Sequence, residues 1–300
     1  ILASDWEGMA KYDVPAALRM FLVRAAEFPA LPERTQQGFA WKAALLRLLR
    51  GRLAADPALL SQPAADAGGE QIPLVSSATP AGYYGNSQGS VVGGGYFASN
   101  PDLRRAVLGV PGCPFGLLLS RSKDFSLYYG VMRLQMWSER DVRILISAIQ
   151  QPWSAGETGG WLGALRAGAG EGKSVLMQVA MGDAQVTTVS AHFLARSINA
   201  STVAVQTRPI WGVAQRDAPF AHANAIVEYH YLDVGPIPAT DTPADPATDT
   251  HECPRRERRG QDQIHAFLGA PAAEGGEVVQ TCRGPRGCES PTCPSGDSNN

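Results

Sequence analysis

Three short stretches of the chain are almost continuously apolar and end at charged or turn-forming residues: 105–111, 174–180 and 225–231. A strand with alternating apolar and polar positions has one solvent-exposed face, whereas a strand that is apolar throughout is buried on both faces. The three stretches are therefore typical of strands in a parallel sheet that helices cover on each side. A shorter β-like stretch lies at 201–206.

Elsewhere the apolar residues recur every three or four positions, which is the spacing of one face of a helix. Asp13 and Pro15 form a typical helix start, and the pattern that follows them extends to about residue 28. A second pattern covers 35–53, and we expect these two helices to cover one face of the sheet. Because strands alternate with helices, the sequence predicts an α/β fold with a mostly parallel sheet and helices on both faces. Further helices are predicted at 88–99, 189–197 and 261–268.

Three segments depart from this alternation. Residues 54–80 are rich in alanine, proline, glycine and serine, which predicts an irregular linker. Residues 121–172 carry tryptophan and methionine on expected helices but no strand pattern, so we expect a helical cap inserted between two strands. Residues 283–300 are dominated by small and turn-forming residues, which predicts a flexible tail. The remaining chain, 1–282, is expected to form a single domain.

A Gly-x-Ser-x-Gly motif places Ser87 between Gly85 and Gly89. In a nucleophile elbow the serine occupies a strained turn between a strand and a helix, so the residues two before and two after it must be small. A short, weak strand pattern at 81–84 precedes the serine and a helix pattern at 88–99 follows it. The chain has 32 glycines, so the motif alone could arise by chance and its context decides.

A serine hydroxyl is a weak nucleophile at neutral pH and needs a base, usually a histidine that a carboxylate holds. Asp183 follows the buried stretch 174–180, at the carboxyl end where parallel sheets place their sites; a helix-capping role is the alternative explanation. His251 lies on a late loop before the last predicted helix, from which it can reach back over the strand ends. His222, on an earlier loop, is the alternative base.

The composition excludes some classes of function. A formal net charge of −2 argues against nucleic-acid binding, which normally needs a basic surplus, and the absence of an 18-residue apolar run predicts no membrane span. Cys113 is expected to be a buried thiol. The spacing of the other four cysteines does not match zinc knuckles, so we expect disulfides in one of three pairings and an oxidising compartment. These four are Cys253, Cys282, Cys288 and Cys293.

With these residues, the chain resembles the α/β-hydrolase superfamily, in particular its bacterial secreted lipases and esterases. The resemblance rests on the serine motif, on Asp183 after a strand and on His251 before a helix. Residues 5–8 are similar to the turn after the family's fourth strand, which implies that its first three strands lie upstream of this chain. It also implies an oxyanion hole with the backbone N–H of Gln88 and a second donor from a loop after the third strand, a loop without a counterpart here.

These observations predict a serine hydrolase that cleaves carboxylic esters through Ser87, Asp183, His251 and an acyl-enzyme, without cofactor or metal. The apolar segment 121–172 favours a small-molecule or lipid ester as substrate. A peptidase or other acyl-hydrolase on the same fold, or a non-catalytic binding protein that keeps the fold, are the alternatives. The cysteines favour an exported protein, located in the periplasm, at the cell surface or outside the cell.

Overall fold

The computed structural model describes residues 1–59, 75, 80–234, 237, 245–269 and 277–294. Seven strands form one sheet, and every pair of neighbours is parallel. The sheet order is β1-β2-β3-β6-β4-β5, and β7 pairs with β6. The prediction of an α/β fold with a parallel sheet is confirmed. The strands are β1 Ala81–Asn86, β2 Leu103–Gly109, β3 Ser174–Ala180, β4 Ser201–Val203, β5 Ala214–Arg216, β6 Ala225–Tyr231 and β7 Cys288–Ser290.

The central strands are buried on both faces, as their continuous apolar pattern requires. Along β2, Ala106 and Leu108 belong to the core on one face, while Val107 belongs to the core on the other. The first face is covered by α3 Gln88–Ser99, α7 Leu162–Gly168 and α8 Thr188–Ser197. The opposite face is covered by α9 Cys253–Arg256 and α10 Arg258–Gly269, with Phe267 fully buried against the strands.

Of the two helices near the amino terminus, only the second contributes to the core on a face of the sheet, with Phe39 and Leu46. Helix α2, Ala30–Arg50, packs on the outside of α3, where Phe39 meets the ring of Tyr96 at 6.3 Å and that of Trp161 at 6.5 Å. Helix α1, Val14–Val23, contacts α5 instead. The expectation fails for α1 because a helical pattern identifies an apolar face but not the partner that covers it.

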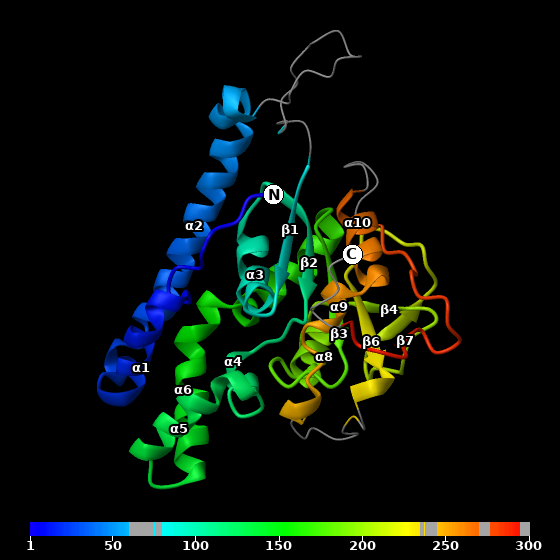
Figure 1. Ribbon diagram of the computed structural model, residues 1–300. Helices are drawn as coiled ribbons and strands as arrows, with labels where there is room; N and C mark the ends of the chain where they lie inside the picture. The colour runs from blue at the N-terminus through cyan, green and yellow to red at the C-terminus, as the bar shows by residue number, and fades with distance from the viewer. Residues whose placement is uncertain (60–74, 76–79, 235–236, 238–244, 270–276, 295–300) are drawn as a thin grey trace.

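A second layer of helices lies toward the carboxyl ends of the strands (Figure 1). It contains α4 Phe115–Leu118, α5 Ser126–Gln135 and α6 Glu139–Trp153, together with α1, and has its own apolar core that includes Met132 and Ile146. We call α1 and residues 115–153 the cap. The segment predicted as a cap, 121–172, thus divides in the structure, because α7 covers the sheet as an ordinary crossover helix.

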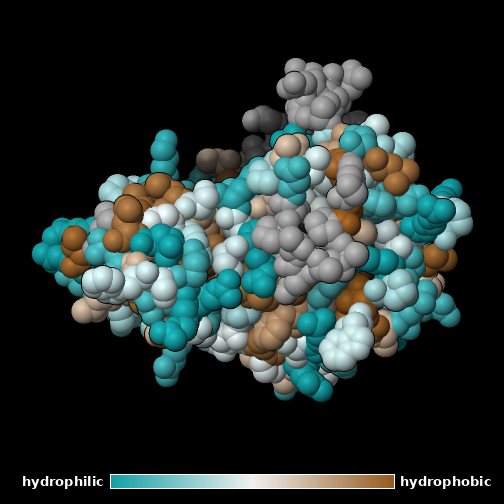
Figure 2. Space-filling view, turned by 90° about the horizontal axis from the view of Figure 1, so that it is seen from below, coloured by the Kyte–Doolittle hydropathy of each residue, from teal (hydrophilic) through white to brown (hydrophobic). Residues whose placement is uncertain are grey.

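Viewed from below the orientation of Figure 1, the surface mixes hydrophobic and hydrophilic residues (Figure 2). Leu134 and Trp137 of the cap are 80% and 99% exposed. Within the part of the chain that the structure describes, none of the helices combines the length and apolarity needed to cross a lipid bilayer. Short 3₁₀ helices lie at Lys11–Asp13, Ala25–Glu27, Arg52–Ala55, Pro57–Leu59, Lys123–Phe125, Ser154–Gly156, Thr158–Trp161, Ala169–Glu171, Leu232–Val234 and Pro246–Thr248.

The carboxyl-terminal segment differs from the flexible tail predicted for 283–300. Strand β7 pairs with the carboxyl-terminal half of β6, on the edge whose amino-terminal half pairs with β4. Disulfides join Cys253 to Cys293 and Cys282 to Cys288, so the prediction of disulfides is confirmed and their pairing is set. The small, polar residues of this segment predicted flexibility, but a three-residue strand and two disulfides hold it in place. Residues 295–300, and most of the predicted linker 54–80, lie outside the described residues.

Candidate active site

Ser87 lies between the end of β1 and the start of α3, with φ 57° and ψ −124°. Such a conformation costs a non-glycine residue about 1–3 kcal/mol and is found mostly at functional sites. The glycine at Gly85 is required, because a Cβ there would lie 2.2 Å from the carbonyl oxygen of Gly89. Gly89 itself has room, since the nearest atom to an added Cβ is the Tyr83 hydroxyl at 3.8 Å. In the helix after the serine, close packing requires a glycine at Gly93 instead, where a Cβ would lie 2.3 Å from the Tyr83 hydroxyl.

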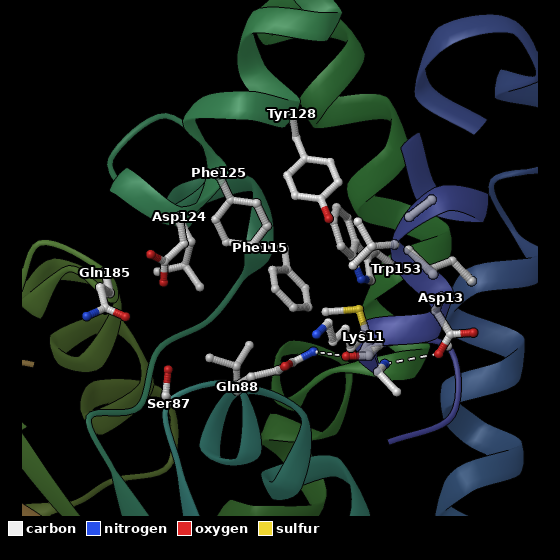
Figure 3. Close-up of a pocket in the computed structure, with 18 of the residues that line it drawn as sticks. Lys11, Asp13, Ser87, Gln88, Phe115, Asp124, Phe125, Tyr128, Trp153 and Gln185 are labelled. Carbon is white, nitrogen blue, oxygen red and sulfur yellow. Dashed lines mark hydrogen bonds between the residues drawn. The ribbon is translucent and has the colours of Figure 1, made fainter. Parts of the chain in front are cut away.

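The Ser87 hydroxyl points into a pocket beneath the cap (Figure 3). Gln88 is the first residue of α3, so its backbone N–H has no partner within the helix and lies at the positive end of the helix dipole. The Gln88 side chain donates a hydrogen bond of 2.7 Å to the carbonyl oxygen of Met9. This bond holds the amino-terminal segment across the pocket beside the serine.

Asp183 and His251 form a buried pair at the carboxyl end of the sheet. The two atoms Nδ1 of His251 and Oδ2 of Asp183 lie 2.8 Å apart, and both residues are at most 3% exposed. The other oxygen of Asp183 accepts hydrogen bonds of 2.8 Å from the backbone N–H groups of Gln185 and Val186. Burial raises the pKa of Asp183, while the hydrogen bonds from His251 and from these backbone groups oppose the rise.

The remaining ring nitrogen of His251, Nε2, is buried and has no hydrogen-bond partner among the described residues. An imidazole that donates from Nδ1 to a carboxylate has an acceptor at Nε2, which is the tautomer that a general base needs. Buried polar atoms without partners are rare in folded proteins. An unpaired Nε2 is therefore suited to receive a proton from a group that approaches during a reaction.

Several observations relate His251 to Ser87, although no hydrogen bond joins them. Ser87 follows β1 and Asp183 follows β3, with β2 between them, so the strand spacing separates the two turns by about 10 Å. An imidazole between them can span that gap. Asp124 borders the pocket together with Ser87; burial raises its pKa, and His251 lies near enough to oppose the rise. Catalytic hydrogen bonds are often long or unformed in structures without substrate.

The alternative base lies elsewhere. His222 is exposed and precedes β6, whereas Ser87 follows β1. Because the strands are parallel, the two residues lie at opposite ends of the strands, and His222 cannot reach the serine. The side chain of His192 is 2.7 Å from Glu228, and His230 pairs with Glu289, so both have structural partners.

The pocket has a volume of about 470 Å³ and mostly apolar walls. Phe115 and Trp153 of the cap stack at 4.2 Å between ring centres and form one wall. Ala17 and Phe21 of α1 line it as well. The polar and charged residues at the pocket, besides Ser87, include Lys11, Asp13, Gln88, Asp124 and Gln185 (Figure 3).

Sequence reasoning missed the contribution of α1 to the pocket, and it missed Asp249, whose carboxylate contacts the segments of both Asp183 and His251. A signal for Asp249 was present, since it lies two residues before His251 on the same loop. Among the described residues, no group of three or more potential ligand side chains is placed to hold a metal ion. No protein-family model matches the chain, and no significant match was found among curated proteins or solved structures.

Proposed function

We propose that the protein is a serine hydrolase of the α/β-hydrolase type that cleaves carboxylic esters with an apolar acyl group. The observation that carries the proposal is the hydrogen-bonded pair of Asp183 and His251, in which Nε2 of His251 has no partner among the described residues. The pair lies at the carboxyl ends of the strands, where the strained Ser87 also lies. Strain at a nucleophile and a buried base without a partner both have a cost that a purely structural role does not explain.

In the proposed reaction, the Ser87 hydroxyl attacks the ester carbonyl while Nε2 of His251 takes its proton. Asp183 keeps the imidazole oriented and stabilises its charged form. The backbone N–H of Gln88 donates a hydrogen bond to the oxyanion of the tetrahedral intermediate. His251 then gives the proton to the leaving alcohol, and a water molecule, activated in the same way, releases the acid from the acyl-enzyme.

The pocket supports an apolar acyl chain. Its walls are aromatic and aliphatic, and Phe115, Trp153 and Phe21 lie on the cap side of the serine. Burial of a methylene group stabilises a complex by about 0.8 kcal/mol, which corresponds to about fourfold in kcat/KM. On p-nitrophenyl esters of rising chain length, kcat/KM is expected to increase by up to this factor per methylene until the pocket is full. A preference for acetate over every longer ester contradicts the apolar-chain part of the proposal.

Labelling with a fluorophosphonate probe tests the chemistry. The wild-type protein is expected to be labelled, and Ser87→Ala to be unlabelled. Ser126→Ala is the matched control, because Ser126 is exposed on the cap and its hydroxyl donates a hydrogen bond to the carbonyl oxygen of Lys123, away from the pocket lining. Labelling of a folded wild type that persists in Ser87→Ala, or that never occurs, means that the protein is not a hydrolase of this type. Persistent labelling places the nucleophile at another residue, whereas a folded wild type that is never labelled favours a binding protein on the same fold.

We also propose that the protein works in an oxidising compartment outside the cytoplasm. The disulfides Cys253–Cys293 and Cys282–Cys288 support this location, because such bonds persist where thiols are not kept reduced. Thiol labelling and mass measurement of protein isolated from its native compartment test it. Four labelled thiols at these positions, without added reductant, contradict export.

A further inference from the structure

One carboxylate, that of Asp249, joins three segments around the base. Its Oδ1 atom accepts hydrogen bonds from the backbone N–H groups of Ala184, at 3.0 Å, and His251, at 3.2 Å. Its Oδ2 atom accepts from the side-chain amide of Gln185 at 2.8 Å and lies 2.6 Å from the ammonium group of Lys123. The side chain is 11% exposed, so these four contacts are largely shielded from water.

The three segments are the turn that carries Asp183, the loop that carries His251 and the part of the cap around Lys123. A backbone hydrogen bond of 2.9 Å from Lys123 to the carbonyl oxygen of Ala184 joins the cap to the same turn. The Thr250 hydroxyl donates to the carbonyl oxygen of Met181 at 2.8 Å, which ties the loop to the end of β3. Asp249 is thus the centre of a network between the acid, the base and the cap.

The charge of Asp249 suits this role. Burial alone raises the pKa of Asp249, but hydrogen bonds from Lys123, Gln185 and two backbone groups outweigh burial and bring it below its ordinary value. The carboxylate is therefore ionised at neutral pH, and charge-assisted hydrogen bonds are about twice as strong as neutral ones.

We propose that Asp249 is a positioning residue, which sets the place of the His251 imidazole relative to Asp183 and, through Lys123, makes that place depend on the seating of the cap. The inference rests on the proposed hydrolase function. A catalytic group that moves by about 1 Å can lose about 10²-fold in rate. An interaction that holds the base should therefore appear in kcat more than in KM.

The test compares Asp249→Asn with Glu252→Gln on a short ester. In Asp249→Asn one amide oxygen can still accept from the backbone, but the –NH₂ group faces the donors of Lys123 and Gln185. We expect kcat to fall by about 10–100-fold while KM changes less than about threefold. Glu252 is the matched control, because its carboxylate lies on the same loop but, among the residues that the structure describes, pairs with Arg255 and Arg256 instead. Its variant is expected to keep the wild-type kcat.

Lys123→Met removes the ammonium contact between the cap and Asp249. The backbone bonds of Asp249 and the backbone bond from Lys123 to Ala184 remain. It is expected to lower kcat by a smaller factor, and the double variant with Asp249→Asn to be no worse than Asp249→Asn alone, as expected for one network. Wild-type kcat in Lys123→Met, or two effects that multiply, overturns the coupling to the cap. If Asp249→Asn does not fold, as judged by circular dichroism, Lys123→Met decides the proposal.

A measurement independent of activity distinguishes this inference from the proposed function. The proton between Nδ1 of His251 and Asp183 should give a far-downfield ¹H NMR resonance in the wild type and in Ser87→Ala. We expect the resonance to shift or broaden in Asp249→Asn and to stay unchanged in Glu252→Gln. A change of this kind in a protein without esterase activity supports the positioning role while the proposed function fails. An unchanged resonance together with an unchanged kcat overturns the positioning role.

Discussion

Glu157 predicts how the stability of the protein depends on pH. The residue has no exposed surface and lies between the end of α6 and the residues that pack on α3. Its Oε1 atom accepts hydrogen bonds from the side chain of Gln150, at 2.6 Å, and from the backbone of Phe115, at 3.3 Å. Its Oε2 atom is buried and has no hydrogen-bond partner within the described part of the chain. Burial raises the pKa of Glu157 from 4.5 to about 7, and the hydrogen bonds only partly oppose the rise.

The sign of the effect follows from the two pKa values. Below about pH 4.5 the carboxyl is protonated in both states, and above about pH 7 it is ionised in both. Between these limits the folded state holds a proton that the unfolded state has lost. The free energy of unfolding therefore falls as pH rises through this window, by about 1.4 kcal/mol per pH unit and about 3 kcal/mol in total.

The perturbation is Glu157→Gln, which keeps an acceptor for Gln150 and Phe115 but cannot ionise. Urea unfolding, followed by circular dichroism at several pH values from 4.5 to 8, gives the free energy of unfolding of each protein. We expect the variant to gain about 3 kcal/mol relative to the wild type between the two ends of the window. Other titrating groups cancel in this difference.

Glu171→Gln is the matched control, because Glu171 is exposed. Its stability relative to the wild type should not change with pH by more than a few tenths of a kcal/mol. A constant difference between Glu157→Gln and the wild type across the whole range refutes the assignment of a raised pKa to Glu157.

Three further predictions concern the site. Gly85→Ala should abolish fluorophosphonate labelling and lower the free energy of unfolding by about 2 kcal/mol or more, because its Cβ meets a backbone oxygen; Gly130→Ala, with open space at its Cβ, should do neither. Ala17→Trp fills part of the pocket, so the preferred p-nitrophenyl ester should become shorter while acetate hydrolysis stays within about threefold of wild type; an unchanged chain-length profile contradicts the role of α1. Reduction of the Cys253–Cys293 disulfide should lower ester hydrolysis because Cys253 lies two residues after His251, and retention of full activity in the reduced protein argues against this link.

The parallel sheet could be predicted because β2, β3 and β6 are apolar on both faces, a pattern that few other structures produce. Strands β5 and β7 escaped prediction, since three residues are too few to show a period. The strand before Ser87 was weak in sequence because β1 contains two glycines and has one described neighbour, β2.

The candidate site could be predicted only in part. The contact between Asp183 and His251 follows from general rules, since both come after strands of one parallel sheet. The sequence alone could not exclude His222 as the alternative base, because its place relative to Ser87 depends on the direction of β6. His222 precedes β6 and therefore lies at the amino ends of the parallel strands, opposite Ser87. The position of α1 over the pocket depends on tertiary packing, for which a helical pattern carries no information.

The link from Cys253 to Cys293 has a consequence for the order in which the site is assembled. Ser87 is synthesised early, whereas the covalent link beside the loop that carries His251 forms only after Cys293 has been made and oxidised. If Ser87 and His251 act as proposed, the protein holds its nucleophile before this link fixes the segment that carries its base. On the proposed function, ester hydrolysis is expected to rise as the disulfide forms in a refolding time course, and full activity before the disulfide forms contradicts this order.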